Sequence, residues 1–299
     1  MIKADNITKT FDGFPALKDL NCIIPKGCIY GLIGSNGAGK STFLRLITGV
    51  YKADSGSITL EGENVYENPN AKTKIAFIPD ELFFLSNASL KRMASLYKAI
   101  FPNFDNVRFK ELADIFHLDT SKSVNTFSKG MRRQAATILA LSCKPEYLFF
   151  DETFDGLDPV MRNLVKNILV TDVLERKSTV IITSHSLREL EDTCDQLALL
   201  HKGGIVFESD VQNLKTSLFK IQIALSSDYD KNIFDGLDML SFSKKGSVSI
   251  FIVRGDREKT EAHLRELQPV LLDILPLSLE EVFVHEMDAL GYSFRDLVE

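Results

Sequence analysis

The first part of the chain, up to about residue 80, alternates short apolar runs with turn signals, a pattern typical of strands. A helix is expected over Thr42–Gly49, where the apolar residues share one helical face and a glycine ends the pattern. The strands are expected at Ile2–Thr8, Leu20–Ile24, Cys28–Ile33, Ser57–Leu60 and Lys74–Ile78.

From about Leu82 to Lys144 the strand signals vanish and the apolar spacing becomes helical. Pro102 stops the first helix of this stretch, since proline cannot continue a helical hydrogen-bond ladder. We therefore expect a helical subdomain over about residues 82–144, inserted in an α/β domain. Its helices are expected at Ser89–Ile100, Asn106–Phe116 and Lys129–Ser142.

Apolar strands then return in alternation with helices, which favours a mostly parallel sheet. The expected strands are Tyr147–Phe150, Ser178–Ile182, Gln196–Leu200 and Ile205–Phe207, and the expected helices are Met161–Leu174 and Leu187–Cys194.

After about residue 215 the rhythm changes to that of a small α+β domain. Ser278 opens its last helix, with Glu281 in capping-box position. We expect an α/β domain over residues 1–215 and an accessory domain over residues 216–299. The accessory domain combines strands at Phe219–Leu225, Leu237–Ser243, Ser247–Val253 and Val270–Leu275 with a helix at Glu258–Leu267.

Length and charge agree with two domains and disfavour nucleic acid as a partner. A chain of 299 residues exceeds what one compact core usually holds. Its 35 basic and 41 acidic residues give a net charge of −6, so no broad positive field attracts nucleic acid. No apolar run is long enough for a membrane span, and we expect a cytosolic protein with buried, reduced cysteines.

A glycine-rich loop after the strand Cys28–Ile33 matches the phosphate-loop pattern G-x4-G-K-[ST]. Its glycines let backbone N–H groups point at phosphate oxygens, and the following helix adds the positive end of its dipole. Lys40 can reach the β- and γ-phosphates, and the Ser41 hydroxyl can ligate Mg²⁺. The expected ATP-binding residues here are Gly34, Ser35, Asn36, Gly37, Ala38, Gly39, Lys40, Ser41 and Thr42.

Two acids, Asp151 and Glu152, end the apolar strand that begins at Tyr147. At the tip of a strand, Asp151 is placed to hold Mg²⁺ through water. Glu152 can polarise a water molecule for attack on the γ-phosphate, which makes it the expected catalytic base.

Three further segments follow in a fixed order around the acid pair: Phe127–Met131 before it, Phe154–Pro159 directly after it, and Thr183–His185 at the end of the next strand. With the phosphate loop, this set resembles the nucleotide-binding subunit of ATP-binding-cassette (ABC) transporters over about residues 1–215. The resemblance implies a P-loop NTPase fold with an additional antiparallel β portion, and an ATPase that uses ATP and Mg²⁺.

The resemblance also implies roles for residues outside the phosphate loop. Phe11 falls where the family stacks an aromatic ring on adenine, although an aromatic residue there is more often part of a core. Ser128 and Gly130 fall in the signature loop, which contacts the γ-phosphate held by the opposite subunit. Asp158 falls in the loop that crosses the dimer, and His185 at the switch histidine, which contacts the γ-phosphate.

The implied assembly is a head-to-tail homo- or heterodimer of ATPase chains. Each ATP would lie between the Lys40 loop of one chain and the Ser128 loop of the other. The resemblance implies that the dimer drives a separate transmembrane permease from the inner face of the membrane. Substrate selectivity resides in that permease.

Two positions depart from the family pattern. Lys129 replaces a glycine of the signature, which adds positive charge next to phosphate. Asp80 replaces the glutamine of the lid loop, and an acid there can bind Mg²⁺ or water. These variants, with the ending Ser278–Val284, resemble the ABC-2-type exporter subunits of Gram-positive bacteria. Within that group, the runs Phe154–Met161 and Leu187–Asp192 resemble the Ytr type.

Two other functions stay open at this point: an ABC ATPase that acts on ribosomes or DNA, and a nucleotide-dependent regulator with little turnover. One cassette per chain, the absence of a heptad run and the acidic charge count against the first. We expect Arg132 and Arg133 to be surface charges of a helix, and the repeat of Phe154–Asp158 at Phe234–Asp238 to be chance.

Overall fold

The computed structural model describes residues 1–299 except 153, 155, 290 and 292–299. These residues form two compact units, Met1–Glu208 and Ser209–Glu299. The boundary that we expected after residue 215 falls inside helix α8 (Val211–Ser217), which belongs to the second unit. Thr153 and Asp155, on either side of Phe154 in the acid-pair region, lie outside the described residues.

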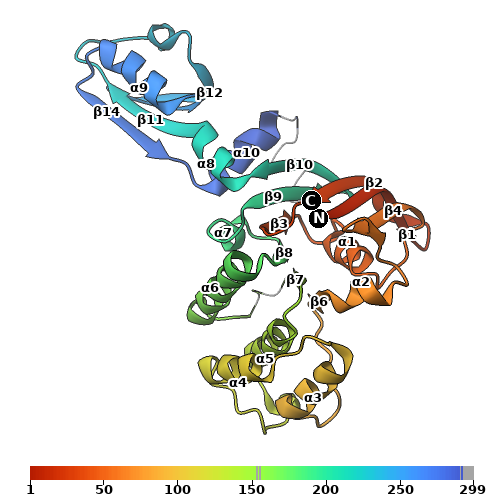
Figure 1. Cartoon of the computed structure of the whole chain (residues 1–299). Coiled ribbons are helices and arrows are strands. Elements are labelled where there is room, and N and C mark those ends of the chain that lie inside the picture. The colour runs from red at the N-terminus through yellow and green to blue at the C-terminus, as the bar shows by residue number, and fades with distance from the viewer. Residues whose placement is uncertain (153, 155, 290, 292–299) are drawn as a thin grey trace. The chain divides into compact units, whose positions relative to one another are not determined.

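A six-stranded sheet is the centre of the first unit (Figure 1). β3, β8, β7 and β6 pair in parallel, as do β3 and β9, so these strands end at the same edge of the sheet. The mostly parallel sheet expected from the sequence is confirmed. Its strand order is β10 (Gly204–Asp210), β9 (Gln196–His201), β3 (Ile29–Ile33), β8 (Thr179–Ser184), β7 (Tyr147–Asp151) and β6 (Ile75–Ile78).

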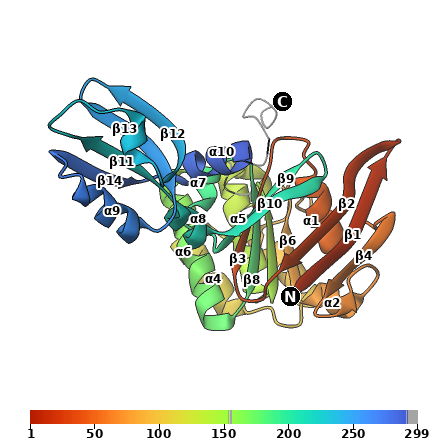
Figure 2. The ribbon, with the colours of Figure 1, turned by 90° about the horizontal axis from the view of Figure 1, so that it is seen from above.

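A second sheet, antiparallel, lies beside helix α1 (Lys40–Ile47), as Figure 2 shows. Phe43, Leu44 and Ile47 of α1 join one apolar core with residues of both sheets. The first strand continues to Phe11, past the expected end at Thr8, because it pairs with the second strand as an antiparallel hairpin up to Phe11 and Phe14. The strand order is β2 (Phe14–Ile24), β1 (Ile2–Phe11), β4 (Ser55–Leu60) and β5 (Glu63–Asn64).

Helices occupy the stretch between β6 and β7, at the bottom of Figure 1. They are α3 (Leu90–Ile100), α4 (Asn106–Ile115), the 3₁₀ turn η1 (Val124–Thr126) and α5 (Lys129–Ser142). Ser89, Asp105 and Ser128 cap the helices that follow them, since each side chain accepts a backbone N–H of the first turn.

The remaining helices of the first unit differ from expectation in length. α6 (Pro159–Arg176) is longer at both ends, whereas α7 (Leu187–Leu190) ends four residues before Cys194. α2 (Pro69–Thr73) was not expected, although Asn68 caps it and a proline stands at its first position. Within the described residues, no helix has both the length and the apolar character needed to cross a bilayer.

The second unit is a four-stranded antiparallel sheet with helices, which confirms the expected α+β class. Its core gathers aromatic and aliphatic side chains, among them Phe234, Phe251 and Leu264. Phe234, from the repeat that we interpreted as chance, is buried in this core. The strand order is β12 (Asp238–Lys245), β13 (Val248–Arg254), β11 (Leu218–Ala224) and β14 (Leu271–Pro276), with η2 (Lys231–Phe234), α9 (Arg257–Glu266) and α10 (Leu279–Ala289).

Candidate functional site

The glycine-rich loop joins the fully buried strand β3 to the first turn of α1. Gly39 adopts φ +112°, and a Cβ there would lie 2.6 Å from the carbonyl oxygen of Ala16. A Cβ at Gly34 would lie 2.4 Å from the carbonyl oxygen of Leu200. A side chain at either position would clash with the backbone, so only glycine allows the tight loop that precedes α1.

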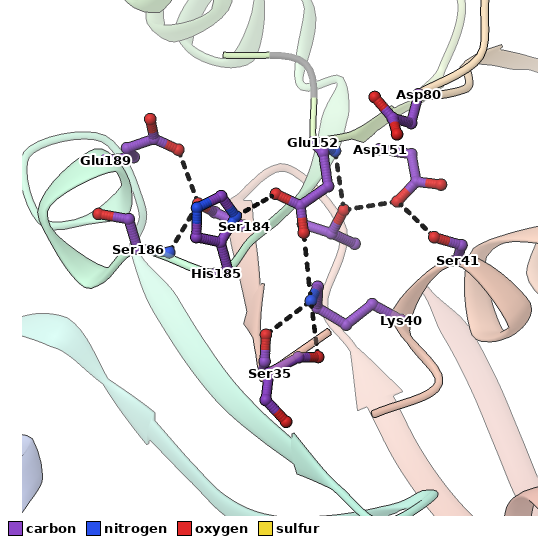
Figure 3. Close-up of polar contacts among 12 residues, drawn as sticks. Ser35, Lys40, Ser41, Asp80, Asp151, Glu152, Ser184, His185, Ser186 and Glu189 are labelled. Carbon is purple, nitrogen blue, oxygen red and sulfur yellow. Dashed lines mark hydrogen bonds and ion pairs between the residues drawn. The ribbon is translucent and has the colours of Figure 1, made fainter. Parts of the chain in front are cut away.

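Lys40 is buried at the start of α1, 6% exposed, and its ammonium faces the loop. Nζ donates to the carbonyl oxygens of Gly34 at 2.6 Å and Ser35 at 3.1 Å. It also lies 3.1 Å from Oε1 of Glu152 (Figure 3). The Glu152 carboxylate therefore holds the cation that an incoming phosphate would need, and the two anions compete for it.

Asp151 ends β7 and is almost completely buried. Its Oδ1 accepts hydrogen bonds from Ser41 Oγ at 3.1 Å and Thr183 Oγ1 at 2.8 Å. Burial raises the pKa of the Asp151 carboxyl; the two hydroxyl donors lower it, and the charges of Glu152 and Asp80 raise it. A carboxylate kept in such a place favours a cation beside it.

Glu152 follows Asp151 in the left-handed backbone region, at φ +48°. Its backbone N–H donates to Thr183 Oγ1 at 3.1 Å, which helps to fix this uncommon conformation. Its Oε2 lies 3.0 Å from Nδ1 of His185, just after the end of β8. Glu152 thus connects Lys40 on one side with His185 on the other.

Lys40 and Glu152 line a cavity of about 250 Å³ at the carboxyl edge of the parallel sheet, and Asp151 and His185 lie behind this lining, in contact with Ser41 and Glu152. Asp80 reaches its rim from the segment after β6, and its Oδ1 accepts a hydrogen bond from Arg133 of α5 at 2.6 Å. The expectation that Arg133 is a surface charge is wrong, because the side chain is 1% exposed. The cavity is lined by Ala16, Asn36, Gly37, Gly39, Lys40, Ser41, Thr42, Asp80 and Glu152.

Other predicted site residues make local contacts in this single chain. Ser128 accepts the N–H of Met131 at 3.2 Å, and Asp158 accepts the N–H of Val160 at 3.0 Å, so both cap helices. Gly130 packs close to the backbone of Gly156. None of these three is among the cavity-lining residues of the described chain.

Phe11, the predicted adenine contact, lies at the end of β1 and is 40% exposed. Its ring meets Tyr51 edge-on at 5.5 Å between centroids, and Nζ of Lys9 lies 5.5 Å from its centroid. This ring is partly open to solvent and is not a core residue, although Lys9 lies over one of its faces.

The donors at the cavity suit Mg²⁺ in their chemistry. Ser41 and Asp151 present oxygen atoms in mutual contact, and Asp80 adds a carboxylate at the rim. Among the described residues, no group of three or more His, Cys, Asp or Glu side chains could hold a metal by itself.

Two further residues belong to this cluster without a role predicted from the sequence, Thr183 and Arg133. Thr183 bonds Asp151 and the Glu152 backbone, and it is opposite Asp151 in the β7–β8 register. The position of Thr183 near the end of a buried parallel strand could have indicated that it lies at the site. Arg133 carried no local signal, because its burial depends on a partner 53 positions away.

Comparison with known proteins gives a consistent result. A family model described as ABC transporter matches residues 17–155. The ABC transporter ATP-binding protein YtrB of Bacillus subtilis is 33% identical over 95% of this chain and 97% of its own. The bacitracin transport ATP-binding protein BcrA of Bacillus licheniformis is 30% identical over 78% of this chain and 77% of its own.

Solved structures agree on the fold. An ATP-binding subunit of an ABC transporter superposes with a TM-score of 0.67 at 22% identity, covering 72% of this chain and 92% of its own. A dimeric ATP-binding cassette in a post-hydrolysis state, bound to ADP and phosphate, gives a TM-score of 0.65 at 20% identity over 71% and 99% of the two chains.

Proposed function

We propose how this chain works from the premise that it belongs to the family of ABC transporter ATP-binding proteins. It is the ATP-binding and ATP-hydrolysing subunit of an ABC transporter, and the resemblance to Ytr-type subunits is confirmed. Of the functions that the sequence leaves open, transport is favoured over a ribosomal, DNA-directed or purely regulatory ATPase. We infer the roles of its residues, its partners and its direction of transport from the geometry of the site and from its relatives.

One set of contacts supports the mechanism: Lys40, Ser41, Asp151, Glu152 and His185 are linked side chain to side chain beside the cavity, and they come from the ends of β7 and β8 and the start of α1. In the proposal, the loop from Gly34 to Thr42 cradles the phosphates with its N–H groups and the N-terminus of α1. The γ-phosphate binds the Lys40 ammonium, which breaks the ion pair between Lys40 and Glu152. Adenine stacks on Phe11.

Released from Lys40, Glu152 acts as the general base. Its carboxylate polarises the water that attacks the γ-phosphate. His185, 3.0 Å from Glu152, orients that carboxylate and contacts the γ-phosphate. The left-handed backbone of Glu152 supports this role, since strain of this kind is retained where a side chain must be aimed.

Ser41 and Asp151 would hold Mg²⁺, with Asp80 acting directly or through water. When bound, the ion would neutralise charge that develops on the phosphate oxygens. The raised pKa of the Asp151 carboxyl supports this assignment, because a cation beside it removes the cost of the buried charge.

A second chain supplies the rest of each site. Ser128, Gly130 and Asp158 do not line their own chain's cavity, and the side chains of Ser128 and Asp158 are exposed. In a head-to-tail dimer they would face the nucleotide of the opposite chain. Lys129, also exposed, would add a positive charge to that contact. The dimer is a homodimer or a heterodimer with a related ATPase.

The membrane partner is a separate transmembrane permease, contacted by the helical subdomain over about residues 82–144. Phe83 and Leu85 support this, because both are exposed apolar side chains on the segment just after Asp80. The chain would act in the cytoplasm, on the inner face of the membrane. Export is favoured by the likeness to a bacitracin transport protein and to the linearmycin resistance protein LnrL of Bacillus subtilis.

Mixing two inactive variants tests the shared site. Lys40→Ala removes the phosphate cation, whereas Ser128→Asp keeps a good helix cap but places an anion against the γ-phosphate. In a mixed dimer, one site has both defects and the other has none. We expect the mixture to recover about a quarter of the wild-type ATPase rate, since about half of the dimers are mixed and one of their two sites is complete.

Ser128→Asn is the matched control, because it keeps the cap without the charge. It should retain far more activity than Ser128→Asp. If the mixture stays as inactive as its components while both variants still form dimers, the shared site is refuted. If Lys40→Ala alone keeps normal ATP affinity, the phosphate-loop assignment fails.

A further inference from the structure

The most unusual charge outside the catalytic cluster is Arg133, in the second turn of α5. Its side chain is 1% exposed, and Nη2 donates to Oδ1 of Asp80 at 2.6 Å. Asp80 itself is 54% exposed. A buried guanidinium is therefore paired with a carboxylate that reaches into solvent at the cavity rim.

The burial of Arg133 depends on this one carboxylate. Its Nε and Nη1 atoms are buried and have no hydrogen-bond partner among the described residues. Removing a guanidinium from water costs several kcal/mol unless a charge compensates for it. Because burying the Arg133 guanidinium is costly, its pairing with Asp80 at the edge of the nucleotide cavity suggests a function at that cavity.

Asp80 faces that cavity with Lys40, Ser41 and Glu152. Its charge also acts on Asp151, whose pKa it raises. The Asp80 carboxylate is thus close enough to the metal-binding pair to respond to a cation, and it is held there by Arg133.

Arg133 lies on the same helix as Ser128, which caps α5 five positions earlier. The residues of this helix from Arg133 to Ser142 are all buried, so the helix packs against its neighbours along most of its length. A displacement of Asp80 would therefore act on the helix that carries the signature serine.

Resting on the proposed function, we propose that Arg133 is a positioning residue. It holds the Asp80 carboxylate at the metal side of the cavity, and through this ion pair it couples cation occupancy to the α5 helix. The charged pair Asp80–Arg133 is the unit that acts here, so each partner depends on the other.

A double-mutant cycle of Asp80→Gln, Arg133→Gln and the combined variant tests this pair. Asp80→Gln leaves a buried arginine unpaired, Arg133→Gln leaves Asp80 without an anchor, and the combined variant removes both charges. Arg132→Gln is the matched control: it is the adjacent arginine of α5, but Arg132 donates to the carbonyl oxygen of Asn125.

Two measurements are made on the full chain: the ratio of ATP affinities with and without Mg²⁺, and the thermal midpoint without nucleotide. Each single variant should lose about tenfold of the Mg²⁺-dependent gain in affinity, as expected when a residue supporting a metal ligand is removed. Asp80→Gln should also lower the midpoint. The combined variant should have a higher thermal midpoint than Asp80→Gln. Its loss of the Mg²⁺-dependent increase in ATP affinity should be smaller than the losses of the two single variants added as free energies.

Additive effects in the cycle would overturn the proposal. So would an Arg133→Gln variant with a lower midpoint but an unchanged Mg²⁺ gain, because Arg133 would then be only structural. ATP affinity without Mg²⁺ should stay near wild type in the Arg132→Gln control. Its loss in Lys40→Ala is a separate test, so failure of the ion-pair proposal can be distinguished from failure of the proposed function.

Discussion

The two units of the chain place their charged side chains differently. The first unit buries Lys40, Arg133 and Asp151 almost completely. In the described part of the second unit, the buried polar side chains are Ser249 and Thr260, and neither carries a charge. Among its described residues, the ion pairs Lys244–Asp228 and Arg265–Glu261 join side chains that are partly or fully exposed.

The buried charges of the first unit include residues that act in the chemistry of the site, whereas the buried side chains of the second unit stabilise its fold. Burying a charge costs stability that apolar packing would not cost. The first unit accepts that cost beside the cavity, and also at Asp172 of α6, which pairs with Arg108 and Arg176. The second unit fills its core with rings: Phe251 lies 4.8 Å from Phe234 and 6.0 Å from Phe242, between ring centroids. We therefore expect variants of the residues beside the cavity to alter turnover, and variants of the second unit's aromatic core to alter stability.

The largest expected effect is on turnover, from Glu152→Gln. The amide keeps the shape of the side chain but cannot accept a proton, so kcat should fall by about 10²- to 10⁴-fold. ATP should still bind and closed dimers should accumulate, as measured by steady-state hydrolysis and size-exclusion chromatography with ATP. Glu111→Gln, an exposed acid on α4, is the control. Undiminished hydrolysis by Glu152→Gln would refute its role as base.

The next effect is on stability, and it tests the role of the second unit. Phe251→Ala removes a fully buried ring from the second unit and should cost about 3–5 kcal/mol of its unfolding free energy. ATP affinity should stay unchanged. Hydrogen exchange resolved by segment, combined with a nucleotide titration, measures both quantities in the full chain. Val270→Ala, at a 74% exposed position, is the control and should cost little. Loss of ATP binding in Phe251→Ala would contradict the separation of roles.

Local patterns explain why so much of the first unit could be predicted. The phosphate loop, the acid pair and the strands before them are contiguous segments, and the chemistry of each segment follows from neighbouring residues. Parallel pairing then brings the strand ends together, as in the register of Asp151 with Thr183. The expected residues Lys40, Ser41 and Asp80 therefore meet at one cavity.

The features that the sequence could not predict depend on contacts between distant segments. The burial of Arg133 follows from its pairing with Asp80, and no periodicity of α5 distinguishes it from the surface arginine that we expected. Likewise, the Lys40–Glu152 ion pair joins residues 112 positions apart. The extension of β1 to Phe11 reflects hairpin pairing with Phe14, which lies beyond the apolar run that we used to place the strand.

A smaller effect concerns surface charge in the first unit. Ion pairs with Lys26, and then with Lys74, lower the pKa of the Glu61 carboxyl to about 2. Because this pKa is lower in the folded than in the unfolded chain, the pairs add stability above the unfolded value, and that stability is lost as the pH falls toward about 2. The side chain is partly exposed, so solvent screening limits the gain to about 1 kcal/mol.

Glu61→Gln tests this assignment by urea unfolding at two pH values. The variant should be about 1 kcal/mol less stable than wild type near pH 7, and the difference should shrink as the pH falls toward about 2, where about half of the wild-type carboxyl is protonated. ATP affinity near pH 7 should not change. A difference that persists unchanged at low pH would mean that Glu61 stabilises by packing rather than by charge.

The smallest effect comes from the exposed pair of the second unit. Arg265 donates to Glu261 at 2.6 Å one turn apart on α9, and the arginine is 68% exposed. Such helix-surface pairs contribute about 0.3–0.5 kcal/mol, because water screens them and ordering two long side chains costs entropy. Glu261→Gln should therefore shift the unfolding free energy by no more than this, and added salt should erase the shift. A loss above about 1 kcal/mol would show that the second unit also depends on its charges, and the contrast between the units would weaken accordingly.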